Sequence, residues 1–135
     1  MARKVTDIEG IGPASQTKLS EIEITTVDQL LEKGATPKGR QEIHEKTGID
    51  AKRVLKWVGM ADLFRIKGVA SQFAELLKAA GVDTVKELKM RNADNLHTKL
   101  VEVNEEKKLA RAVPRLEQVK DFVQQAKELE PVVTY

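Results

Sequence analysis

The sequence contains no cysteine, and aromatic residues make up only 4% of its 135 positions. The lack of cysteine excludes disulfide bridges and thiolate metal ligands, and it is compatible with a reducing compartment. Because aromatics are so few, Leu, Ile, Val and Ala must supply most of any core. No run alternates β-branched and polar residues as strands do. The composition therefore predicts an all-α protein.

Long apolar segments are also missing. No stretch approaches the roughly 18 apolar residues that a membrane-spanning helix needs. The first residues, Met1-Ala2-Arg3-Lys4-Val5, lack the apolar segment of a signal peptide. We therefore expect a cytoplasmic protein that makes no contact with a membrane.

The sequence has little excess charge of either sign. Its 23 basic and 21 acidic residues give a net charge of +2. Proteins dedicated to nucleic acids usually carry a stronger basic bias or a one-sided basic patch. This balance argues against tight DNA binding.

Residue patterns that signal catalysis or metal binding are absent. The two histidines, His44 and His97, have no His or Cys neighbours at metal-ligand spacing. No serine stands in a nucleophile elbow, and no dinucleotide-binding or P-loop pattern occurs. We expect a protein that is not an enzyme, with no catalytic residues, no cofactor and no metal.

The strongest pattern is an internal repeat. Ile8-Glu9-Gly10-Ile11-Gly12 is followed 58 positions later by Ile66-Lys67-Gly68-Val69-Ala70. The same offset relates Leu19 to Leu77, Ile24 to Val82, Thr26 to Thr84, Val27 to Val85 and Leu30 to Leu88. A periodicity of this length indicates a duplicated supersecondary unit.

The repeat continues more weakly toward the C-terminus. Trp57, Val58 and Ala61 correspond to Phe122, Val123 and Ala126 at an offset of 65. The additional residues fall most simply within 105–114, a basic insertion. The pattern predicts two lobes, 1–62 and 63–135, each of about four helices and packed together, with Trp57 and Phe122 at matching core positions.

Local signals place several helix ends. Pro13 suits the first turn of a helix that continues to about Ile22. Thr26 and Thr84 are expected to cap helices that reach about Leu31 and Arg91. Three glycines are expected to end helices in the left-handed conformation: Gly34, Gly48 and Gly81.

Each copy of the repeat opens with a turn that can bind an anion. Glycine adopts backbone angles that are costly for other residues and allows close approach of another chain. The apolar residue after it, Ile11 or Val69, is expected to point inward and anchor the turn. Exposed N–H groups then lie at a helix N-terminus, where the helix dipole favours negative charge. Asp7 and Glu9 flank the first turn and would repel a phosphate.

These segments resemble the hairpin of the helix-hairpin-helix family. The chain as a whole is similar to a bacterial family of unknown function that carries two such motifs. The resemblance is most specific over Ile8–Leu31 and Leu63–Leu88. The resemblance implies a tandem helix-hairpin-helix fold. It also implies a surface that binds DNA phosphates largely independently of base sequence.

Together these features predict a non-catalytic module that binds duplex DNA weakly and without sequence preference. The backbone groups would come from six turn residues: Gly10, Ile11, Gly12, Gly68, Val69 and Ala70. Lys18, Arg65 and Lys67 would add positive charge. The alternative is a scaffold for a protein partner built on the same tandem fold, which the near-neutral charge favours.

Overall fold

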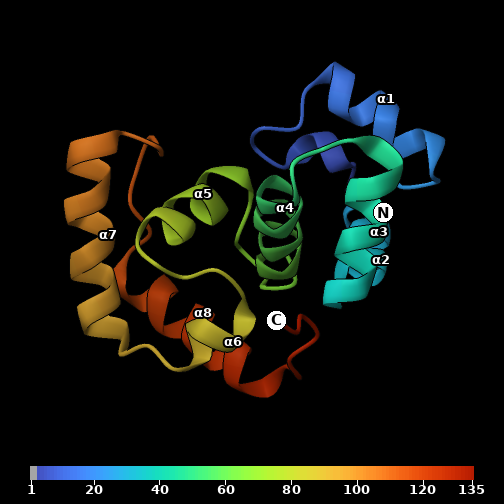
Figure 1. The fold of residues 1–135 in the computed structure, drawn as a ribbon. Coiled ribbons are helices and arrows are strands. Elements are labelled where there is room, and N and C mark those ends of the chain that lie inside the picture. The colour runs from blue at the N-terminus through green and yellow to red at the C-terminus, as the bar shows by residue number, and fades with distance from the viewer. Residues whose placement is uncertain (1–2) are drawn as a thin grey trace. The chain divides into compact units, whose positions relative to one another are not determined.

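The computed structural model describes residues 3–135, and within them it contains helices and no β-strand. The predicted all-α class is confirmed. One short 3₁₀ helix precedes eight α-helices: η1 (Val5–Asp7), α1 (Pro13–Glu21), α2 (Val27–Gly34), α3 (Pro37–Thr47), α4 (Ala51–Leu63), α5 (Ser71–Ala79), α6 (Val85–Lys89), α7 (Ala93–Lys107) and α8 (Leu116–Glu128) (Figure 1). None of the helices in the described part of the chain has the length and apolar character needed to cross a bilayer.

The chain divides into two compact units. The first unit comprises Met1–Asp62 together with Val132–Tyr135, and the second comprises Leu63–Pro131. The first therefore holds α1 to α3 and nearly all of α4, and the second holds α5 to α8. The sequence-based division had assigned 132–135 to the second lobe. How the two lobes pack stays a prediction.

In the first unit, α2 begins at a side-chain cap and packs through an apolar face. The Thr26 hydroxyl accepts the backbone N–H of Gln29 at 3.1 Å, and the Gln29 side chain accepts the Thr26 N–H at 3.2 Å. This reciprocal pair satisfies donors that a helix start otherwise leaves free. Leu30 is fully buried, and α2 packs against both η1 and α3. The expected cap at Thr26 is confirmed.

Gly34 does not end α2 in the left-handed conformation, and that expectation is wrong. Gly34 is itself helical and buried, and the residue after it, Ala35, has φ −61°. A Cβ added to Gly34 would lie 2.3 Å from Cγ2 of Val58. Glycine is therefore required here for close packing of α2 against α4. Gly48 and Gly81 do adopt positive φ, 74° and 97°, as predicted.

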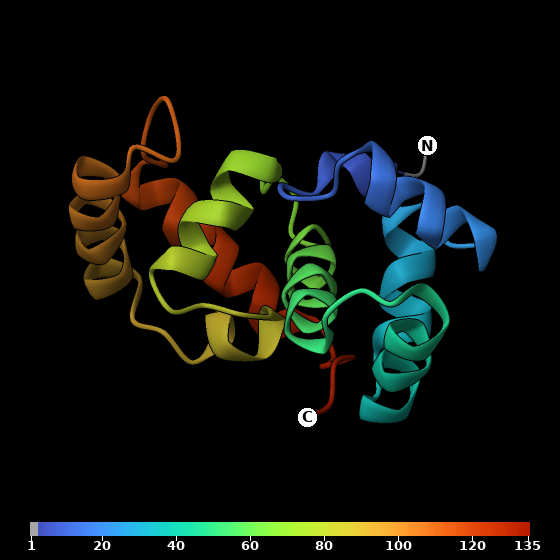
Figure 2. The same ribbon diagram turned by 45° about the horizontal axis from the view of Figure 1, so that its top comes forward.

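In the second unit, α8 packs against both α6 and α7 (Figure 2). The buried face of α8 repeats at helical spacing: Val119, Phe122, Val123 and Ala126. Thr84 precedes α6 as predicted, but its hydroxyl does not cap the helix backbone. It donates instead to a Glu87 carboxylate oxygen at 2.6 Å. Because the hydroxyl hydrogen-bonds to this side chain, the predicted backbone cap at Thr84 is wrong.

The basic segment 105–114 covers the end of α7 and most of the loop that follows it. Helix α7 has 15 residues where α3 has 11, and Lys108, which follows its last residue, adopts φ 52°. The Asn104 side chain then holds the loop, because it accepts the Ala110 N–H at 2.9 Å and donates to the Ala110 carbonyl at 3.1 Å. The loop is thus fixed to the helix by an amide that mimics a peptide group.

The C-terminal segment 132–135 belongs to the first unit through Arg40. Arg40 is only 7% exposed, and its guanidinium makes the contacts. It donates to the carbonyl of Gly34 at 2.9 Å, of Ala35 at 3.1 Å and of Thr134 at 2.6 Å. The Thr134 N–H in turn donates to the Ala35 carbonyl at 2.8 Å. Burial lowers the pKa of Arg40, and an electrostatic interaction with Tyr135 opposes that effect.

Candidate functional site

Both glycine motifs fold as the same kind of β-turn. The Ile11 N–H donates to the Ile8 carbonyl at 3.2 Å, and the Val69 N–H donates to the Ile66 carbonyl at 3.1 Å. The third residue of each turn is glycine, with φ 99° at Gly10 and 97° at Gly68. A type II turn requires positive φ at this position, which is why glycine is needed. Ile11 and Val69 are 5% and 0% exposed, so each anchors its turn as expected.

The residue before each following helix lacks a side-chain cap. Gly12 has φ −94° and ψ −173°, and Ala70 has φ −110° and ψ −172°. These angles are open to any residue, and a Cβ at Gly12 would meet nothing within 4 Å. Alanine in the second copy therefore preserves the backbone. Neither residue offers a side-chain acceptor, so the N–H groups in the first turns of α1 and α5 have no side-chain cap. In α1 these groups begin at Ala14, because Pro13 has no N–H.

The matching backbone geometry extends beyond the turns. After α1 and α5, the N–H groups of Ile24 and Val82 donate to the carbonyls of Leu19 and Leu77, both at 2.9 Å. The chain reverses there through positive φ, 65° at Glu23 and 97° at Gly81. The 58-residue offset therefore describes real local geometry within each unit. Duplication of the complete lobes stays a prediction.

An aromatic ring packs beneath each turn glycine. A Cβ at Gly10 would lie 3.3 Å from the indole nitrogen of Trp57, and one at Gly68 would lie 3.0 Å from Cε1 of Phe122. Both rings are 2% exposed. The predicted burial of Trp57 and Phe122 is confirmed, and each ring supports the turn of its own unit.

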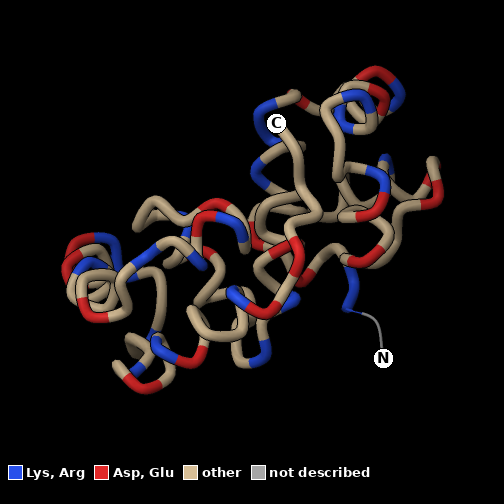
Figure 3. Tube along the Cα trace, turned by 90° about the horizontal axis from the view of Figure 1, so that it is seen from below, with Lys and Arg blue, Asp and Glu red and all other residues tan. Residues whose placement is uncertain are grey.

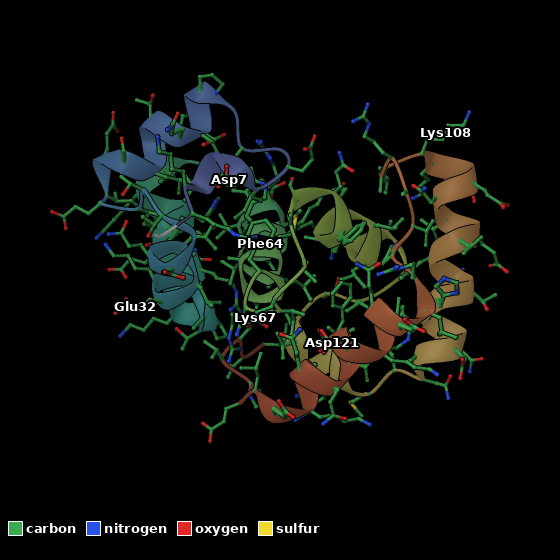
Figure 4. All side chains as sticks on the ribbon, turned by 180° about the vertical axis from the view of Figure 1, so that it is seen from behind. Asp7, Glu32, Phe64, Lys67, Lys108 and Asp121 are labelled. Carbon is green, nitrogen blue, oxygen red and sulfur yellow. The ribbon has the colours of Figure 1, made fainter. Side chains whose placement is uncertain are left out.

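The second turn is fixed by a contact that the sequence did not reveal. The Gln125 side chain accepts the Lys67 backbone N–H at 2.8 Å and donates to the Lys67 carbonyl at 3.1 Å. It also donates to Asp121 at 2.8 Å, and Figure 4 labels Lys67 and Asp121. The residue 65 positions before Gln125 is Met60, which is apolar and buried. The internal repeat therefore could not have predicted the contact between the Gln125 side chain and the Lys67 backbone.

The predicted cations differ in how near they lie to the turns. Lys67 is exposed and lies within the second turn. Arg65 precedes that turn and donates to the Glu130 carbonyl at 3.0 Å. Lys18 lies in the last turn of α1, at the opposite end of the helix from Gly12. The structure thus places Arg65 and Lys67 beside a turn but not Lys18.

Arg53 is a cation near the first turn that the sequence reasoning missed. Its guanidinium carbon lies 4.8 Å from the centre of the Trp57 ring, the geometry of a cation–π contact. The spacing of four residues on one helix would have been the signal. Asp7, which Figure 4 labels on η1, and Glu9 are the exposed acidic residues of this turn.

Charge is otherwise mixed along the chain. Lys and Arg alternate with Asp and Glu over short distances in each unit (Figure 3). Two surface grooves of about 490 and 520 Å³ lie in the first unit, and both are lined by Glu23 and Lys33. Neither of these two grooves is lined by a turn residue.

The fold and the site define an all-α protein with two glycine turns, each opening a helix over a buried aromatic ring. Residues 9–129 match the family described as Domain of unknown function (DUF4332), and the chain belongs to that family. Neither the curated proteins nor the solved structures contain a match.

Proposed function

We propose that this protein is a non-catalytic module that binds duplex DNA through phosphate contacts at its helix-hairpin-helix turns, without reading base sequence. The observation that supports the proposal is the paired turn geometry. Gly10 and Gly68 share the same backbone conformation, and each turn leads into a helix whose first N–H groups have no side-chain cap. Such N–H groups are suited to a phosphate oxygen.

The two turns are not equivalent in charge. Lys67 and Arg65 make the second turn attractive to phosphate, whereas Asp7 and Glu9 reduce the affinity of the first. The Lys67 amide is already bonded to Gln125, so the Lys67 side chain and the helix N–H groups must contact the phosphate. With a net charge of only +2, few phosphates are neutralised. We expect a dissociation constant of about 10⁻⁴ to 10⁻⁶ M at physiological salt.

A scaffold for a protein partner is the second candidate. The acidic residues at the first turn and the mixed charge elsewhere favour it, because neither helps to hold a polyanion. The same exposed turns would then contact a protein surface. The two candidates differ in their dependence on salt and on phosphate.

The test is a titration of labelled duplexes of two unrelated sequences at several salt concentrations. Each neutralised phosphate contributes about −0.9 to the slope of log affinity against log salt. Lys67→Glu should weaken binding of both duplexes equally, and Gly68→Val should abolish it if circular dichroism shows that the fold persists. Lys120→Glu, an exposed change of the same charge on α8, is the matched control.

Three results together support DNA binding: equal affinities for the two duplexes, an affinity that falls as salt is raised, and a larger loss for Lys67→Glu than for Lys120→Glu. If the unmodified protein shifts no duplex at low salt and high micromolar concentration, the DNA hypothesis fails. The scaffold for a protein partner then becomes the better explanation.

A further inference from the structure

We propose that the indole N–H of Trp57 and the guanidinium of Arg53 complete an oxyanion site at the first glycine turn, selective for a phosphate group. The first observation is the burial of the ring, which is 2% exposed, together with the position of its nitrogen. That nitrogen lies 3.3 Å from the point where a Cβ of Gly10 would be. Gly10 is exposed, so the indole nitrogen lies directly beneath an exposed residue of the turn.

The indole N–H makes no hydrogen bond to another of residues 3–135, and its nitrogen is not among the fully buried unpaired side-chain atoms of those residues, so water or a ligand can reach it. Tryptophan rings that are buried as a whole usually place this donor on a hydrogen-bond partner. Here the donor lies beside Gly10, two residues before Gly12, the uncapped N-cap of α1. A ligand oxygen at Gly10 would satisfy the indole N–H and the free helix N–H groups together.

Arg53 supplies the charge that the turn itself lacks. Its guanidinium lies over the same ring, 4.8 Å from the centre, and its side chain is otherwise exposed. The charge is therefore held close to the indole nitrogen. Asp7 and Glu9 oppose it, so the site should hold a phosphate group weakly, and neutralising Glu9 should strengthen binding.

The second unit provides the natural contrast. Phe122 occupies the corresponding place under Gly68, and its ring carries no donor. Trp57→Phe therefore gives the first turn the ring type that the second turn already has. Phe122 shows that a phenyl ring packs under a glycine turn of this kind, so loss of binding in a folded Trp57→Phe variant reports the lost N–H rather than a lost ring.

The phosphate group could belong to a DNA backbone or to a free phosphate ion, and this inference rests on the proposed function only for the first source. The chain has a single tryptophan, so a ¹⁵N-labelled sample shows a single indole N–H resonance. Sodium phosphate is titrated against sodium chloride at equal ionic strength, and a short duplex is titrated separately. We expect the indole resonance and the Gly10 and Gly12 amides to shift together and to saturate at one dissociation constant.

Three variants then separate the contributions. Trp57→Phe, followed through the Gly10 and Gly12 amides, should weaken binding about tenfold, the effect of one hydrogen bond to a charged acceptor. Arg53→Gln should weaken it about threefold, as for an exposed ion pair. Glu9→Gln should strengthen it by a similar factor. Lys52→Gln, which removes a charge from the exposed side of the same helix turn, should change nothing.

The two arms distinguish this proposal from the proposed function. Shifts with both probes support both ideas and identify the DNA backbone as a source of the phosphate. Shifts with phosphate but no binding of duplex support the oxyanion site and refute DNA binding. If duplex binds while the indole resonance stays still and Trp57→Phe binds equally well, the oxyanion site is refuted and DNA binding remains. If the indole N–H resonance does not shift with either phosphate or duplex, the oxyanion site is also refuted.

Discussion

Gly34→Ala tests the close packing of α2 against α4. Alanine should favour the helix by up to about 1 kcal/mol relative to glycine. Its Cβ would lie 2.3 Å from Cγ2 of Val58, whereas carbon atoms prefer about 3.5–4.0 Å. Val58 is fully buried, so its methyl group cannot turn into solvent. Overpacking of this kind costs about 1–3 kcal/mol, and we expect a net loss of about 1–2 kcal/mol.

A double-mutant cycle with Val58→Ala isolates the contact. Val58→Ala alone removes buried methyl groups and should cost about 2 kcal/mol. In the double variant the new Cβ faces the remaining Val58 Cβ position at 3.5 Å, an ordinary contact. The loss should therefore be smaller than the sum of the single losses by about 1–2 kcal/mol.

Urea unfolding followed by fluorescence provides the assay, because Trp57, the single tryptophan, lies next to Val58 in the first unit. The denaturant dependence of the unfolding free energy should stay unchanged, so that midpoint shifts report stability. If the two substitutions prove additive within about 0.5 kcal/mol, the reasoning is refuted. It is equally refuted if Gly34→Ala stabilises the protein.

Three further outcomes are expected. Trp57→Ala and Phe122→Ala should each lower the unfolding free energy by about 3–5 kcal/mol; losses below about 0.5 kcal/mol, measured by urea unfolding, would contradict their burial. Gly12→Ala should change stability by less than about 0.5 kcal/mol, because the added Cβ meets open space, and a larger change by the same assay would show a hidden constraint. Arg40→Gln should speed hydrogen exchange at the Thr134 amide, since the segment loses its 2.6 Å anchor; unchanged exchange by NMR would show that the segment is held by other contacts.

Features that depend on neighbours in sequence could be predicted. The turn at Gly10 and the start of α1 follow from glycine and proline chemistry over a few residues. The cap at Thr26 follows in the same way from its spacing to Gln29. These signals are local, and the structure bears them out.

Features that depend on distant partners could not be predicted. From the sequence alone, Gly34 is predicted to end a helix, because its contact with Val58 cannot be seen there. From the sequence alone, Gln125 is predicted to be a solvated helix residue, because its contact with the Lys67 peptide group joins positions 58 residues apart. Arg53 is an exception, because its spacing of four residues from Trp57 on one helix is a signal that the sequence does carry.

The contact between Arg40 and Thr134 has a consequence for the order in which the protein is made. Residues 132–135 complete the first unit, yet a ribosome synthesises them only after the whole second unit. Until then Arg40 lacks one of its three carbonyl acceptors. The first unit therefore reaches its final form only when synthesis has passed residue 134, and a chain that stops earlier carries an incomplete unit at its beginning.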